Sequence, residues 1–144
     1  MTVAKIEQGH LCEVAELERL CFADPWSEKS LELLLSELAT GFVCLQDGRV
    51  VAYGGMMLTP DEGQITNVAV HPSARRRGLG RAIVDALIRE AQERRLEQIA
   101  LEVRVSNTAA ITLYEHMGFT VAGRRKNFYR FPTEDALVML KKIL

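Results

Sequence analysis

The sequence has few cysteines, no long apolar run and almost no net charge. Its three cysteines, Cys12, Cys21 and Cys44, are odd in number and form no Cys-x-x-Cys pair, so we expect free thiols in a reducing compartment. No apolar run approaches the roughly 20 residues that cross a bilayer, and the amino terminus does not resemble a signal peptide. The net charge of -1 argues against a general nucleic-acid-binding surface. We therefore expect a cytoplasmic protein that binds neither membranes nor nucleic acids directly.

Metal-ligand patterns and hydrolytic triads are also missing. His10, His71 and His116 are widely scattered and form no metal-ligand pattern with cysteines or paired acids. No Ser-His-Asp or Cys-His set can be read from the sequence. We therefore expect no metal.

What is present is an ordinary globular composition. The chain has 144 residues, of which 48% are hydrophobic and 26% are charged. That length supports one sizeable core, and no stretch has the composition of a linker between domains. We expect a single domain over residues 1–144.

Hydrophobic periodicity predicts helices and then strands in the first half of the chain. A helical hairpin is expected over residues 10–22 and from residue 28 onward, where the second helix should carry Leu31, Leu34, Leu35 and Leu38. Three strands should follow at residues 42–46, 50–57 and 65–70. Because short turns join these strands, we expect them to form an antiparallel meander.

The second half of the chain predicts one βαβ unit. A helix from residue 79 to about residue 95 leads to a strand at 98–105, which should run parallel to the strand at 65–70 because a helical crossover makes that connection. The remaining predicted elements are a helix capped by Asn107 and closing strands at 119–122 and 136–140. The order predicts an α/β (α+β) fold, with a mixed central sheet and flanking helices.

The turn from Arg75 to Gly80, with the sequence Arg-Arg-Arg-Gly-Leu-Gly, concentrates donors for an anion. Glycine lets the main chain approach a ligand closely, the helix that follows offers unpaired N–H groups, and guanidinium groups suit phosphate. A ligand that carries phosphates is therefore expected here. The alternative is a tight turn that is merely solvated by its arginines.

Two familiar phosphate turns can be tested by counting. A Walker A loop needs Lys-Ser or Lys-Thr after its last glycine, but Arg81 and Ala82 follow here. A dinucleotide fingerprint needs Gly or Ala where Ile83 stands. Glu102 lies at about the distance of a ribose-binding acid, yet only one βαβ unit is present where a dinucleotide fold needs two halves. The first interpretation fails and the second is weak.

The same turn matches Gln/Arg-x-x-Gly-x-Gly/Ala, and the chain thereby resembles the Gcn5-related N-acetyltransferase (GNAT) superfamily. The predicted order of elements agrees with that fold over nearly the whole chain. The resemblance implies one GNAT domain with acetyl-coenzyme A as co-substrate. It implies a pyrophosphate site at Arg76, Arg77, Gly78, Leu79, Gly80 and Arg81, backbone pairing of the pantetheine arm with Val68, Ala69 and Val70, and a coenzyme A contact from Asn107.

The resemblance also implies where the reactive end of the co-substrate lies. In this superfamily the pantetheine arm enters where two parallel strands splay apart, here those at 65–70 and 98–105. A bulge in the first strand would free an N–H group for the thioester oxygen.

Glu102 is the residue with the clearest chemical implication. A glutamate inside an otherwise apolar strand costs desolvation free energy unless it is paired, so it is informative about function. It is either a functional acid or base, or it forms a structural salt bridge or occupies an outward-facing strand position. Tyr114 has two interpretations as well. Its phenol stays protonated at neutral pH and can donate a proton, but an aromatic residue at helical spacing also packs against its neighbours.

The stretch from Leu101 to Phe119 resembles the RimI-type branch, whose members acetylate the N-terminal alanine of a small-subunit ribosomal protein. The resemblance implies that Glu102 accepts the proton of the α-amine and that Tyr114 protonates the departing thiolate. It also implies that Trp26 and Tyr129 border the cleft that binds the N-terminal segment of the acceptor. The alternatives are an acetyltransferase for lysine, polyamines or other small amines, and a non-catalytic coenzyme A-binding module.

Overall fold

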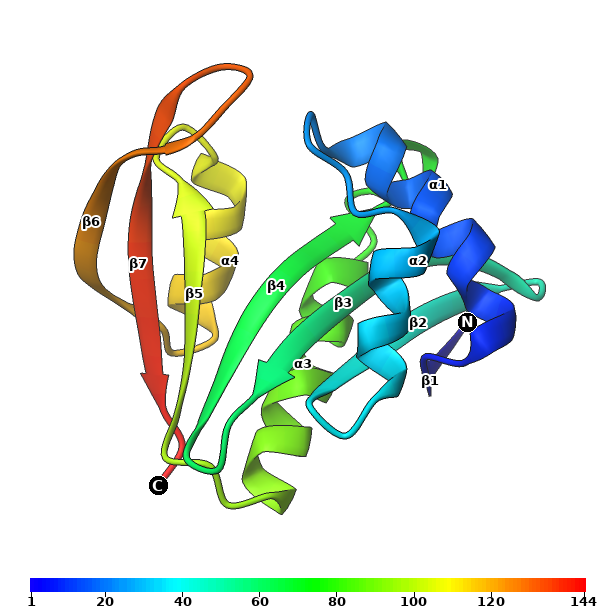
Figure 1. The fold of residues 1–144 in the computed structure, drawn as a ribbon, viewed down its shortest axis with the longest axis horizontal. Coiled ribbons are helices and arrows are strands. Elements are labelled where there is room, and N and C mark those ends of the chain that lie inside the picture. Colours follow the sequence, from blue (N-terminus) through cyan, green and yellow to red (C-terminus); the bar gives the residue numbers. More distant parts are fainter.

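The computed structural model describes residues 1–144 and has a seven-stranded mixed sheet at its centre (Figure 1). The strand order in the sheet is β1-β2-β3-β4-β5-β7-β6. The strands are β1 (Thr2–Lys5), β2 (Ala39–Gln46), β3 (Arg49–Leu58), β4 (Glu62–Val70), β5 (Gln98–Arg104), β6 (Thr120–Tyr129) and β7 (Glu134–Lys142). The helices are α1 (Leu11–Cys21), α2 (Glu28–Leu31), α3 (Leu79–Glu93) and α4 (Thr108–His116), with 3₁₀ turns η1 (Gln8–His10), η2 (Glu32–Leu35) and η3 (Pro72–Ala74). The predicted fold class is confirmed.

Helices cover both faces of the sheet. In Figure 1, α1 and α2 lie in front of the meander and α3 lies behind it. One core cluster packs Leu17 of α1 and Leu31 of α2 against β2 and β3, and the other packs Ile83 of α3 against β4, β5 and β7. None of the helices has the length and apolar character needed to span a bilayer.

The predicted meander and βαβ unit are both confirmed. β2, β3 and β4 pair antiparallel in sequence, and β4 pairs parallel with β5 across α3. The tight turn between β2 and β3 has positive φ values at Asp47 (53°) and Gly48 (77°), as a primed hairpin turn requires.

The second predicted helix is much shorter than the leucine pattern suggested. It makes one α-helical turn and then one 3₁₀ turn, so Leu38, which was expected on it, lies beyond its end and is 62% exposed. A 3₁₀ turn places residues three apart on one face, which buries Leu31 and Leu34 together. The Ser36 hydroxyl donates to the Leu33 carbonyl (2.8 Å) at the end of this turn.

The pairing of β4 and β5 stops halfway along both strands. Residue pairs run only from Glu62↔Gln98 to Ile65↔Leu101, although β4 continues to Val70 and β5 to Arg104. Figure 1 shows the two strands diverging from this closed end. The expected splay between the parallel strands is confirmed, and it leaves one edge of each strand without a partner strand.

The expected bulge begins where the splay begins. Between the pairs Met56↔Ile65 and Gly54↔Val68, β3 contributes only Gly55, whereas β4 contributes both Thr66 and Asn67. Two residues opposite one is the definition of a β-bulge, and it leaves main-chain groups outside the regular ladder.

Gly54 allows α3 to lie close to the sheet. A Cβ atom at this position of β3 would collide with the Ile83 side chain of α3 and lie 3.4 Å from Leu87. The start of α3 also lies beside the end of β4, since a Cβ atom at Gly80 would be 3.8 Å from the Val70 side chain.

We expect Gly54→Ala to lower the free energy of unfolding by about 1–3 kcal/mol, because an added methyl group overpacks the contact between α3 and β3. Gly123→Ala is the matched control, since a Cβ there would have no neighbour within 4 Å. Urea denaturation of both variants measures the difference. Equal stability of the two variants would show that the contact can relax without cost.

Candidate active site

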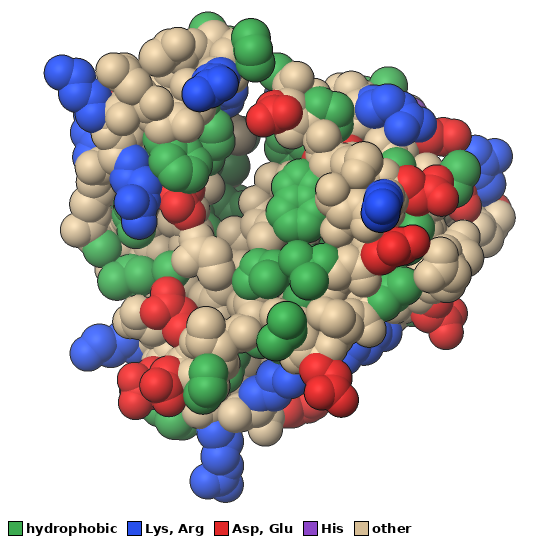
Figure 2. All heavy atoms as spheres, in the orientation of Figure 1, with side chains coloured by type: hydrophobic (Ala, Val, Ile, Leu, Met, Phe, Trp, Pro, Cys, Tyr) green, Lys and Arg blue, Asp and Glu red, His purple; other side chains and the backbone are tan.

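The splayed strands open a cleft of about 850 Å³. Figure 2 shows the molecule hollowed between the half that carries β1 to β4 and the half that carries β5 to β7. The loop between α1 and α2 forms one wall, and the connection between β6 and β7 forms the other. Predicted site residues that line the cleft are Trp26, Val68, Glu102, Asn107, Tyr114 and Tyr129. The fold therefore gathers side chains that are more than 100 positions apart in the sequence.

The predicted phosphate turn lies at the end of β4 and outside the cleft lining. Gly78 is the N-cap of α3 with a left-handed φ of 77°, and Arg76 is also left-handed at 64°. The amides of Leu79 and Gly80 belong to the first helical turn and have no acceptor within the helix. Arg77 donates to Gln46 (3.1 Å), and the side chains of Arg76, Arg77 and Arg81 are all exposed. The turn presents positive charge and free donors to solvent.

The end of β4 connects the cleft to this turn. Val68 lines the cleft, and Val70 immediately precedes the loop that contains the turn. On one side Val68, Ala69 and Val70 pair with β3, while the opposite edge has no partner strand because β5 has diverged. At the end of this edge the Val70 carbonyl accepts a hydrogen bond from Arg75 Nε (3.2 Å). An extended ligand can pair with such a free edge while its charged end reaches the turn.

Glu102 is half-buried at the floor of the cleft, with 17% of its side chain exposed. Gln64 Nε2 on β4 donates to its Oε1 at 2.5 Å, and Arg125 Nε on β6 lies 3.5 Å from its Oε2. The predicted alternative of a salt bridge is thus present, although Arg125 is 59% exposed and such pairs contribute little. A carboxylate has room for about four hydrogen bonds, so Glu102 retains acceptor sites toward the cleft.

Tyr114 of α4 is both a packing residue and a cleft residue. Its ring lies edge-on to Phe119 at 5.6 Å between centroids, and it is part of the larger core cluster. Burial raises the pKa of its phenol to about 12, with a smaller contribution from Tyr129. The hydroxyl is therefore protonated at neutral pH and able to donate.

Asn107 and Trp26 each combine a structural contact with a place in the cleft lining. Asn107 caps α4, because its Oδ1 accepts from the Ala110 amide (3.2 Å), and it also lines the cleft. Trp26 packs against the core cluster of α1 and α2 and lines the cleft as well.

Arg104 holds the connection between β6 and β7 in place. Its guanidinium donates to the carbonyls of Pro132 (3.0 Å) and Arg130 (2.8 Å) and pairs with Glu134 (3.0 Å). It also lies 4.5 Å from the centre of the Tyr129 ring. Because Tyr129 lines the cleft, this network fixes one wall of it.

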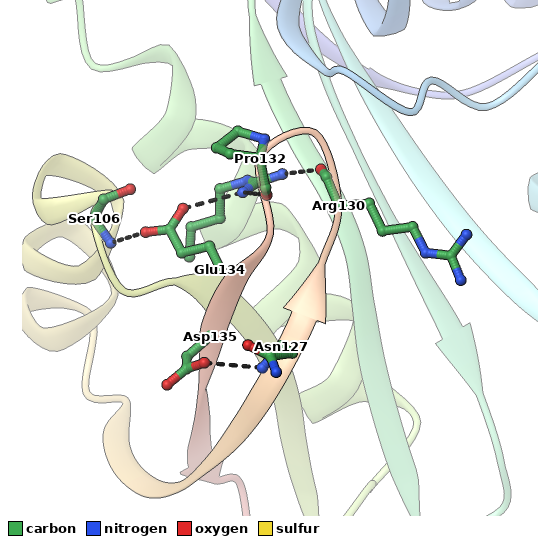
Figure 3. A network of polar contacts seen from close by, with 7 residues as sticks. Ser106, Asn127, Arg130, Pro132, Glu134 and Asp135 are labelled. Carbon is green, nitrogen blue, oxygen red and sulfur yellow. Dashed lines mark hydrogen bonds and ion pairs between the residues drawn. The ribbon is translucent and has the colours of Figure 1, made fainter.

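Two acidic residues complete the network. Glu134 accepts from the Ser106 amide (2.8 Å), and its hydrogen bonds with Ser106 and Arg104 hold its pKa below the ordinary value. Asp135 accepts from the Asn127 amide (2.9 Å) and pairs with Arg124 (2.7 Å), and these contacts lower its pKa in the same way. Figure 3 shows how both carboxylates tie β7 to neighbouring segments.

Arg104, Gln64 and Glu134 were not identified from the sequence. Arg104 had a usable signal, since it lies two residues after Glu102 in an apolar strand and therefore on the same face. Gln64 and Glu134 had none, because their partners are distant in sequence. No group of three or more His, Cys, Asp or Glu side chains is placed to hold a metal ion.

Comparison with known proteins gives the family. A model of the acetyltransferase (GNAT) family matches residues 11–119. The chain belongs to this family. The superfamily predicted from the turn is therefore confirmed.

Three similar proteins and structures are named for the same activity. The chain is 39% identical over 142 residues to the ribosomal protein bS18-alanine N-acetyltransferase of Escherichia coli (strain K12), covering 96% of this chain and 95% of that protein. Identity to the protein of that name from Salmonella typhimurium (strain LT2) is 37% over 142 residues, with the same coverage of 96% and 95%. The crystal structure of the ribosomal-protein-S18-alanine N-acetyltransferase from Escherichia coli has 38% identity and a TM-score of 0.92, covering 99% of this chain and 93% of that one. The resemblance to the RimI-type branch is confirmed.

The raised pKa of Tyr114 predicts a loss of stability at high pH. Because the pKa of about 12 in the folded state exceeds the ordinary value of 10, the stability that the neutral phenol contributes is fully present below about pH 10 and is lost as the pH rises toward 12. We expect the unfolding free energy of Tyr114→Phe to fall less steeply with pH than that of wild type over this range. The two slopes should differ by up to about 1.4 kcal/mol per pH unit. Urea denaturation at several pH values checks this, because all other groups titrate in both proteins. Parallel curves would contradict it.

Proposed function

We propose that this GNAT protein transfers an acetyl group from acetyl-coenzyme A to the N-terminal α-amine of a protein that begins with alanine. The acceptor is the N-terminal segment of a small-subunit ribosomal protein. The observation that carries the proposal is one cleft, lined by Glu102 and Tyr114, at the splay of β4 and β5. The names of relatives 39% and 37% identical over 142 residues support this choice of acceptor. We place the reaction in the cytoplasm, where ribosomal proteins are made.

The residues at the end of β4 fit the co-substrate. Arg76, Arg77 and Arg81, together with the amides from Gly78 to Gly80, form a helix N-terminal site suited to a pyrophosphate. The free edge of Val68, Ala69 and Val70 offers main-chain groups to the amide-containing arm of coenzyme A, and Asn107 can contact it from α4. Acetyl-coenzyme A supplies the acetyl thioester.

Glu102 and Tyr114 divide the proton transfers between them. Glu102 takes the proton from the ammonium form of the acceptor, directly or through water, which frees the nitrogen lone pair for attack on the thioester carbonyl. Tyr114 gives its proton to the sulfur as the carbon–sulfur bond breaks, and the proton that the new amide nitrogen then loses returns to the phenolate, directly or through water. Main-chain N–H groups at the bulge of Thr66 and Asn67 stabilise the charge that develops on the carbonyl oxygen.

The two walls of the cleft receive the acceptor. Trp26 comes from the loop after α1 and Tyr129 from the end of β6, so they approach the cleft from opposite halves of the molecule. Tyr129 is held by Arg104, which favours a fixed rather than an adaptable binding surface. The binding of a peptide end in this cleft requires no direct contact with nucleic acid.

Replacement of Glu102 tests the proposed base. We expect Glu102→Gln to lower kcat by roughly 10²–10⁴-fold, because general base catalysis contributes about that much. Binding of coenzyme A, measured by calorimetry, should stay unchanged because the phosphate turn is intact. Glu115→Gln, which makes the same change on the exposed side of α4, should keep full activity. Full activity of Glu102→Gln would exclude Glu102 as the base.

The acceptor class is tested by the position of the new acetyl group. We expect mass spectrometry of an alanine-starting ribosomal peptide, incubated with enzyme and acetyl-coenzyme A, to place it on the N-terminal nitrogen. Two alternative acceptors are tested in the same assay. One is the same peptide with a blocked N-terminus but free lysines, and the other is a polyamine. Acetyl groups on lysine or polyamine alone would favour the other acceptors. Binding of coenzyme A without any transfer would favour a non-catalytic module.

A further inference from the structure

One fully buried carboxylate lies between the loop that carries Trp26 and the bulge of β4 at Asn67. Glu18 of α1 is 0% exposed. Its Oε1 accepts from the main-chain N–H of Trp26 at 2.8 Å. Its Oε2 accepts from Asn67 Nδ2 at 2.9 Å and from the hydroxyl of Tyr53. No lysine or arginine forms an ion pair with it.

A carboxylate at this position is not required for packing. The other buried residues of α1 are Leu11, Val14, Ala15 and Leu17, all of which are apolar. A buried charge is unfavourable unless hydrogen bonds compensate for its lost hydration, so an apolar residue would fill the same space at lower cost. The charge is therefore informative about what it holds in place.

The three partners of Glu18 come from three different elements. Trp26 belongs to the loop after α1, Tyr53 to β3, and Asn67 to the bulge of β4. Burial raises the pKa of Tyr53, and the charge of Glu18 raises it further, so the phenol remains a donor. Trp26 and Asn67 both line the cleft, whereas Glu18 does not. Glu18 can act on the reaction only through them.

We propose that Glu18 is a positioning residue for acetyl transfer, whose carboxylate locks the acceptor-binding loop of Trp26 and the bulge at Asn67 into one fixed arrangement. This inference rests on the proposed function. The bulge carries the main-chain donors assigned to the thioester oxygen, and the loop carries a wall of the acceptor site. By binding both, Glu18 sets the distance between the acceptor amine and the carbonyl it attacks. Small errors in such a distance reduce rates strongly.

The test exchanges the two interacting groups. Glu18→Gln presents an amide N–H where a carboxylate oxygen was, and Asn67→Asp places a second carboxylate against the first. Each single variant should lower kcat about 10-fold to 100-fold and raise the KM for the acceptor peptide, with unchanged affinity for coenzyme A. In the double variant the amide introduced on α1 can donate to the carboxylate introduced on β4, so we expect kcat to recover at least tenfold over either single variant.

Val14→Ala is the control for general destabilisation. Val14 lies on the same helix and is fully buried, but contacts none of the three partners through hydrogen bonds. It should lower the unfolding free energy while kcat and KM stay within about twofold of wild type. A double variant that folds but does not recover would overturn the proposal, as would wild-type kinetics in Glu18→Gln. If one single variant does not fold, the double variant is compared with the single variant that does.

A measurement that needs no acceptor substrate distinguishes failure of this proposal from failure of the proposed function. The Trp26 amide should exchange its hydrogen at least tenfold faster in Glu18→Leu than in wild type, because the apolar side chain removes its buried acceptor. If wild-type enzyme acetylates no alanine peptide, the proposed function fails, and the kinetic comparison moves to the amine that it does acetylate. Unchanged exchange at Trp26 would refute the lock whatever the acceptor is.

Discussion

The end of hydrogen bonding between β4 and β5 is the constraint on which the rest of the molecule depends. Beyond Ile65 and Leu101 each strand has a free edge that faces the cleft. Unpaired main-chain groups away from water are unfavourable, so such an opening is stable only if solvent or a ligand fills it. The bulge at Thr66 and Asn67 begins at the same point and turns further donors out of the ladder. The opening is thus built into the register of the sheet.

Three charged side chains at or beside the cleft are each held by hydrogen bonds or ion pairs to neighbouring groups. Glu102 is held by Gln64 and Arg125, and Arg104 by carbonyls of the connection between β6 and β7. Glu18 is held by groups from three elements. Dipoles and charges fixed before the substrate binds need no reorganisation during reaction, which is the physical basis of electrostatic catalysis. The polar network therefore serves geometry more than stability.

Local patterns in the sequence were sufficient for much of the fold. The meander followed from alternating strands and the Asp47-Gly48 turn, and the phosphate turn from its glycines and arginines. Strand β6 was predicted only to residue 122 but extends to Tyr129, because nearly all its side chains are exposed and leave no alternating pattern. Edge strand β1 was missed for the same reason. Partners that meet through tertiary structure, such as Glu18 with Asn67, leave no local signal at all.

The closed end of the splay also links ligand binding to folding. Only four residue pairs join β4 to β5, although one core cluster continues beneath both strands on the α3 side. A ligand that pairs with a free edge would act as a missing strand and bind the native state but not the unfolded chain. Stabilisation by such a ligand grows with the logarithm of its concentration relative to its dissociation constant. The resistance of this protein to unfolding would then report how much coenzyme A surrounds it.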